Sequence, residues 1–197
     1  MMSFFRKFRL KLRDERGVAA IEFALVAPIL FILYFMTMEV SQAIETNKKI
    51  GRISSMVGDL VAQQTPISKD AIDGILDIGA AIIQPYGRSR PTITIEHIRI
   101  EDKANPKAFV TWSRELDGSS KRPGVAENTE TTLPEELMER GRHVVRVTTR
   151  LDYRPVITWT AEQKTALGLV SAFDNIAMSE LSYLHPRNGG SIPCNGC

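Results

Sequence analysis

Histidine and cysteine are scarce in this sequence, with three and two residues respectively among 197. The histidines His97, His143 and His185 are not at metal-ligand spacing from one another, and only His185 lies near the cysteines. Both cysteines, Cys194 and Cys197, stand at the C-terminal end and are too few for a disulfide-dense scaffold. We expect this C-terminal tail to be flexible. The sequence therefore predicts no metal and no cofactor.

Catalytic motifs are missing as well. The sequence has no Gly-rich phosphate loop, no nucleophile elbow, no His-Glu zinc helix and no internal repeat. The segment Cys194-Asn195-Gly196-Cys197 has the spacing of a redox pair, but that chemistry needs the motif at a helix N-terminus beside a βαβ unit. We expect a local disulfide between Cys194 and Cys197 outside the cytoplasm, and we do not expect an enzyme.

Positive charge is confined to the N-terminus. Residues 1–17 hold six cations against two acids, a net charge of +4, so the rest of the chain carries −2 of the total +2. A nucleic-acid-binding domain needs a basic face on its folded part. The sequence therefore argues against a nucleic acid partner.

A single long apolar run follows this basic leader, from Val18 to Met38. Its 21 residues contain one charge, and about 20 helical residues cross the hydrocarbon core. The preceding cations predict a cytoplasmic N-terminus and a C-terminal part outside the cytoplasm, in the periplasm of a Gram-negative cell. Two alternatives are a buried core helix and a cleaved signal peptide ending near Ser41-Gln42-Ala43. The run is too long for either, and a charge inside it further disfavours the signal peptide.

That charge is Glu22, and its position is specific. Gly17 closes the basic leader, Glu22 is the fifth residue after it, and Phe23 follows. A carboxylate inside an apolar span is costly and points to a function by default, although at this depth it can also extend to the headgroups. Pro28 lies further along the span, where a tolerated kink is the simplest interpretation.

The segment RGVAAIEFALVAPILFILYF resembles the N-terminus of the TadE-like family, pseudopilins of tight-adherence (Flp-type) systems, and also the wider type IV prepilin pattern. The resemblance implies cleavage by a membrane-embedded prepilin peptidase between Gly17 and Val18. It further implies that Glu22 pairs with the freed amino terminus of a neighbouring subunit, with Phe23 part of the recognition pattern. The implied partners are the inner membrane, the prepilin peptidase, other pilins or pseudopilins, and secretion platform proteins.

Beyond the span, periodicity predicts an α+β head. The apolar period of three and four continues to Gln63, so one helix is expected from Val18 to Gln63. Alternation predicts strands, and turn residues separate them. In Thr92–Ile100, Ile93 and Ile95 share one face and Ile98 and Ile100 the other, which indicates a bulge near Glu96-His97. The expected elements after the long helix are a helix at Lys69–Ile83 capped by Ser68, strands at Thr92–Ile100 and Phe109–Glu115 (with Val110 and Trp112 inward), an exposed loop at Asp117–Asn128, a short helix at Pro134–Arg140 capped by Thr132, a strand at His143–Tyr153, a helix at Glu162–Val170 and a strand at Ala177–Leu184.

The fold class is thus α+β, a long N-terminal transmembrane helix continuing into a small periplasmic domain with a mostly antiparallel sheet. The predicted division is a leader at 1–17, a span at 18–38 and a periplasmic domain at 39–197. The sequence indicates a TadE-like minor pilin or pseudopilin. The rival interpretations are an unprocessed binding module tethered to the inner membrane and, least favoured, an envelope enzyme.

Overall fold

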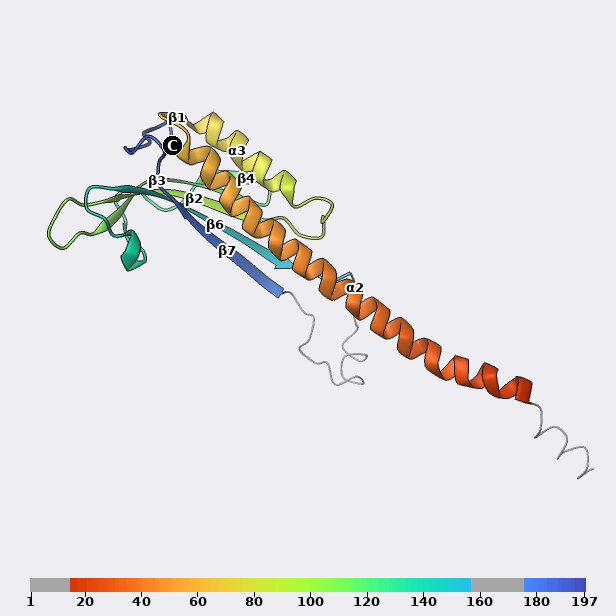
Figure 1. Cartoon of the computed structure of the whole chain (residues 1–197). Coiled ribbons are helices and arrows are strands. Elements are labelled where there is room, and N and C mark those ends of the chain that lie inside the picture. The colour runs from red at the N-terminus through yellow and green to blue at the C-terminus, as the bar shows by residue number, and fades with distance from the viewer. Residues whose placement is uncertain (1–14, 157–175) are drawn as a thin grey trace, which may run out of the picture. The chain divides into compact units, whose positions relative to one another are not determined.

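The computed structural model describes residues 15–156 and 176–197. The chain divides into two compact units, Met1–Gln42 and Ala43–Cys197. One helix, α2, begins at Glu15 and ends at Ala62 and so contributes to both units (Figure 1). The predicted long helix is confirmed.

Within the second unit, α2 packs one apolar stripe against the rest of the domain. Its buried residues recur at three and four positions, as a helix with one core-facing side requires. Gly58 allows close approach of the sheet, because a Cβ there would lie 2.3 Å from Leu184 Cδ1. The fully buried residues of the stripe are Ile50, Ile53, Val57 and Val61.

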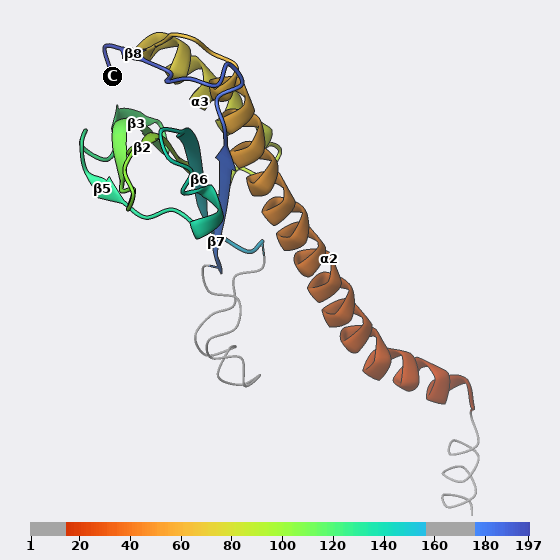
Figure 2. The same ribbon diagram turned by 60° about the vertical axis from the view of Figure 1, so that its left-hand side comes forward.

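A second helix, α3 (Lys69–Ile82), lies beside α2 and ends one residue before the predicted position (Figure 2). Ser68 caps it as expected, because its Oγ accepts a hydrogen bond from the Ala71 amide at 3.3 Å. Gly79 brings α3 close to α2, since a Cβ at this position would lie 2.7 Å from Val57 Cγ2. The two helices therefore cover the same core.

The sheet is antiparallel and has the strand order β4-β3-β2-β6-β7, with β5 pairing with the edge of β3. The predicted α+β class is confirmed, and three of the four predicted strands are matched within one residue at each end. The strands are β2 (Thr92–Ile100), β3 (Ala108–Asp117), β4 (Ser120–Pro123), β5 (Glu130–Thr131), β6 (His143–Tyr153) and β7 (Ile176–Leu184).

Each face of the sheet buries its own apolar cluster. Ile93 and Ile95 belong to the main core with the helices, whereas Ile98 and Ile100 belong to a second cluster. The predicted separation of these two pairs is confirmed, because alternate residues of a strand point to opposite faces. The register shift also lies where the bulge was expected, between His97 and Ile98.

The extra residue of this bulge is in β3 rather than β2. His97 pairs with Trp112 and Ile98 pairs with Val110, which leaves Thr111 without an opposite residue. Val110 and Trp112 are both buried, as predicted, but Val110 joins the second cluster and Trp112 the main core. An extra residue reverses the alternation, so two residues that would share one face lie on opposite faces.

Three local predictions need correction. Asp117–Asn128 is not wholly a loop, because β4 forms a hairpin with β3 around Gly118, whose φ is +63°. The helix predicted at Pro134–Arg140 is only a 3₁₀ turn, η1 (Glu135–Leu137), and no side chain caps it. The helix predicted at Glu162–Val170 lies outside the described residues.

The C-terminal tail is docked, which contradicts the expected flexibility. Strand β8 (Cys194–Asn195) pairs in parallel with β1 (Ile67–Ser68). Ile192 is 1% exposed and belongs to the main core. A tail with a buried isoleucine and ladder hydrogen bonds is part of the fold.

Candidate membrane-anchoring and processing site

The predicted processing site lies in the first turns of α2. Gly17 and Val18 are helical, and Glu22 and Phe23 follow in the next turn. Residues four apart lie on the same helix face, so Val18 and Glu22 are neighbours along one side of the helix. The Glu22 and Phe23 side chains are both exposed in the isolated chain.

The helix around this site exposes large apolar side chains. Ile21 is 64% exposed, Phe23 72% and Leu25 67%, and further exposed apolar residues continue to Phe35. No part of its most apolar window is buried. An apolar surface of this extent requires a membrane or a protein partner to cover it. The helix is long and apolar enough to cross a membrane.

Pro28 lies inside this helix without ending it. Proline removes one backbone hydrogen bond, and transmembrane helices tolerate that loss. Further along, the Thr37 hydroxyl donates to the Leu33 carbonyl at 2.8 Å, so this polar side chain is satisfied within its own helix.

The two cysteines come together at the docked tail. Cys194 and Cys197 form a disulfide with their Cα atoms 5.8 Å apart, and both side chains pack on the main core. Among residues 15–156 and 176–197, no group of three His, Cys, Asp or Glu side chains is arranged to hold a metal ion.

Two of the histidines, His97 and His143, stack on each other. The His97 ring lies 5.0 Å from the ring of His143 and 5.6 Å from that of Trp112, measured between centroids. His97 is fully buried. Burial, and to a smaller extent the charge of His143, lowers the pKa of His97 to about 3. His97 is therefore neutral at physiological pH.

The neutral imidazole of His97 holds the tail in place. Its Nε2 accepts a hydrogen bond from the Ile192 amide at 3.3 Å, so Nδ1 carries the proton and donates to the Thr111 hydroxyl. Trp112 Nε1 donates to the Ile192 carbonyl at 2.7 Å. Both backbone groups of Ile192 are thus satisfied by side chains of β2 and β3. The bulge at Thr111 provides the hydroxyl that fixes the His97 tautomer.

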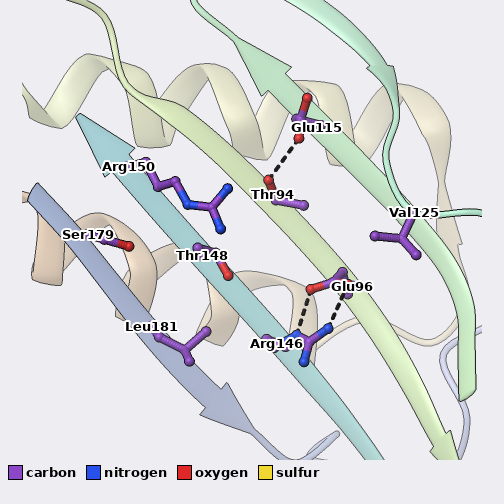
Figure 3. Close-up of a pocket in the computed structure, with 9 residues that line it drawn as sticks. All are labelled: Thr94, Glu96, Glu115, Val125, Arg146, Thr148, Arg150, Ser179 and Leu181. Carbon is purple, nitrogen blue, oxygen red and sulfur yellow. Dashed lines mark hydrogen bonds and ion pairs between the residues drawn. The ribbon is translucent and has the colours of Figure 1, made fainter. Parts of the chain in front are cut away.

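Sequence reasoning missed a set of charged residues on the other face of the sheet. These residues line a hollow of about 430 Å³. In it, Arg146 pairs with Glu96 through two hydrogen bonds of 2.6 and 2.8 Å (Figure 3). Arg150 lines the same hollow further along β6, beyond Thr148, and has no ion-pair partner among the described residues. The detectable signal was the spacing of Arg146 and Arg150, because residues four apart in a strand share one face.

An apolar helix that could cross a membrane, followed by a small α+β unit, indicates a single-pass membrane protein. The family model described as TadE-like protein matches residues 17–50. This match confirms the resemblance inferred from the sequence and begins at Gly17. No curated protein and no solved structure matches the chain.

Proposed function

We propose that this protein is a minor pilin or pseudopilin, processed by a prepilin peptidase, that takes part in assembly of a tight-adherence (Flp-type) pilus or secretion system. The observation that carries the proposal is the family match over residues 17–50, which includes Gly17, Val18, Glu22 and Phe23. Its role is structural rather than catalytic. Its partners are other pilins or pseudopilins, the peptidase and the secretion platform.

The geometry of α2 supports a pairing role for Glu22. Cleavage after Gly17 leaves a positively charged amine on Val18, one helical turn before Glu22 on the same face. At about 1.5 Å per residue, the two groups differ in height by roughly 6 Å. A neighbouring helix shifted by that amount brings its own Val18 amine level with this carboxylate. Each charge then relieves the desolvation of the other.

We place the protein in the inner membrane with its N-terminus in the cytoplasm and its C-terminal domain in the periplasm. The support for this orientation is the net charge of +4 over residues 1–17, since cations stay on the cytoplasmic side. The disulfide between Cys194 and Cys197 is consistent with an oxidising compartment.

The direct test is the N-terminus of the protein recovered from membranes of cells that carry the peptidase. We expect Val18 as the first residue. Gly17→Arg should leave the chain uncleaved. The substitution does not unfold the helix, because arginine favours a helix over glycine by roughly 0.8 kcal/mol. Gly51→Ala is the matched control, because a Cβ there has no neighbour closer than 4.0 Å. It should be processed normally.

Two outcomes contradict the proposal. An N-terminus at Met1 or Met2 favours the unprocessed, tethered binding module. A start near Glu45 favours an ordinary signal peptide.

A second variant separates processing from assembly. Glu22→Gln keeps the shape of the side chain but removes its charge, so cleavage should survive while co-purification with other pilins falls. Breaking one partner of a buried ion pair costs about 3 kcal/mol or more, on the order of a 100-fold loss. Glu45→Gln is the control, because Glu45 is an exposed residue of the same helix. Equal assembly by both variants refutes the pairing role.

A further inference from the structure

We propose that a basic hollow in the second unit binds the phosphate groups of anionic membrane lipids. The hollow has a volume of about 510 Å³ and lies where β2 begins and β3 and β6 end. Three exposed arginines line it, Arg90, Arg150 and Arg154. The inference rests on the membrane anchor of the proposed function and adds a ligand class to the domain beyond it.

The charges of the hollow do not cancel. Arg122 takes two of its acids, with Nη2 lying 2.6 Å from Glu115 and 3.2 Å from Asp117. Among the described residues, Asp152 is then the one lining acid without an ion-pair partner. The three arginines likewise have none. The four arginines and three acids of the lining leave a net charge of +1 around the hollow. Guanidinium groups bind phosphate in a bidentate manner, which suits this surplus to a phosphate group.

The loop that carries Arg90 is held rigidly. The Arg88 guanidinium stacks on Tyr86, 4.8 Å from the ring centroid, and its Nε donates to the Arg154 carbonyl at 2.6 Å. The Ser89 hydroxyl donates to the Asp152 carbonyl at 2.6 Å. These bonds join the segment before β2 to the end of β6. Two sides of the hollow are thus set before any ligand binds, which reduces the entropic cost of binding.

The hollow lies at the end of this unit nearest in the chain to the apolar span. Lys49 Nζ donates to the Gln84 carbonyl at 2.7 Å, which ties the part of α2 near the start of the second unit to the loop that leads to Arg90. Lys49 follows Met38 by only about 11 residues, at most about 40 Å even if fully extended. The opposite end of the unit is joined to the end of α2, where the Arg187 amide donates to the Ala62 carbonyl at 2.9 Å. The hollow thus lies at the end of the unit that a shorter stretch of chain joins to the span.

The lining chemistry favours a lipid headgroup over a protein partner. Protein interfaces depend on buried aromatic or aliphatic anchors. Among the described lining residues of this hollow, Leu151 alone is apolar, and it is already buried in the core. A tethered site also meets membrane lipid at a high effective concentration, so individually weak contacts suffice.

The experiment uses the full chain in lipid nanodiscs of phosphatidylcholine, with or without 30% phosphatidylglycerol. A fluorophore at Ser120→Cys reports energy transfer to a headgroup dye; Ser120 is the first residue of β4 and pairs with Asp117, which lines the hollow. The native cysteines are paired, so the new thiol is the labelling site. We expect transfer to rise with phosphatidylglycerol and to fall again between 50 and 500 mM salt.

The triple variant Arg90→Gln, Arg150→Gln, Arg154→Gln should abolish the response to phosphatidylglycerol. At about fivefold per cation near an anionic surface, three cations amount to on the order of 100-fold in affinity. The control variant Lys103→Gln, Arg140→Gln, Arg142→Gln removes the same charge at the opposite end of β2 and β6 and should keep the response. The single variant Arg90→Gln breaks no ion pair and should lose part of the response to phosphatidylglycerol. It therefore tests the proposal even if the triple variant misfolds.

Each contrary outcome is decisive. A response that survives in the triple variant, or is lost equally in the control, overturns the proposal. A label that responds only to inorganic phosphate or to an acidic peptide assigns the hollow to a soluble anion or to a protein and overturns the lipid assignment. A chain that fails to enter phosphatidylcholine discs refutes the anchor and with it this inference, whereas one that enters but ignores phosphatidylglycerol refutes the inference alone.

Discussion

Protonation of His97 should release the C-terminal tail from the core. The imidazole is fully buried, and its Nε2 must be unprotonated to accept the Ile192 amide. Its pKa is lowered from 6.5 to about 3, so the unfolded chain binds the proton more tightly than the folded one. The stabilisation is therefore fully present above pH 6.5 and is lost as the pH falls from 6.5 toward 3.

The size of this effect follows from the shift. Each pKa unit corresponds to about 1.4 kcal/mol, so a group shifted from 6.5 to about 3 loses about 2 kcal/mol of unfolding free energy between pH 7.5 and pH 5. Burial, and then the charge of Arg99, also lowers the pKa of His143, which adds a contribution of the same sign.

The assay is urea unfolding of the full chain in detergent micelles at pH 5.0 and 7.5, followed by near-UV circular dichroism. His97→Gln removes the titrating group, so its unfolding free energy should change by about 2 kcal/mol less between the two pH values than that of the wild type. His185→Gln, which removes an exposed imidazole, is the control. An equal pH dependence in the wild type and His97→Gln refutes a buried, neutral His97.

Three other predictions concern topology, the disulfide and helix packing. A periplasm-active reporter fused after Cys197 should be active, while a cytoplasmic reporter at the same place should be silent; the reverse pattern overturns the orientation. Fusion after Leu184, the end of β7, would remove the tail that is part of the core. Replacing both Cys194 and Cys197 with serine should lower the unfolding free energy by at most about 2 kcal/mol, since the closed loop is short, and a larger loss in urea unfolding contradicts this. Gly58→Val should destabilise the domain by about 1–3 kcal/mol in the same assay, because a Cβ at position 58 lies 2.3 Å from Leu184 Cδ1. The control Gly74→Val should cost about 1 kcal/mol or less, because a Cβ there has no atom within 4 Å. Equal losses in the two variants contradict the close packing.

Local patterns were sufficient wherever one element decided the outcome. The period of α2, the Ser68 cap of α3 and the alternation of β6 depend on neighbouring residues, and each is confirmed. The predictions failed where the outcome depended on a distant partner. β4 forms because β3 provides a ladder for it, and the bulge lies in β3 because Thr111 bonds to His97 across the strand pair.

The sequence by itself therefore determined the apolar helix, the basic leader, the position of Glu22 relative to Gly17 and the α+β class. These features are periodic or contiguous along the chain. Only the tertiary structure decided that the tail is docked and that three arginines surround one hollow. Ile192 lies 95 residues from His97. Arg90 precedes β2, whereas Arg150 lies in β6 and Arg154 follows it. Their proximity arises from strand register and from the packing of α2 and α3 on the sheet, which no local pattern of residues encodes.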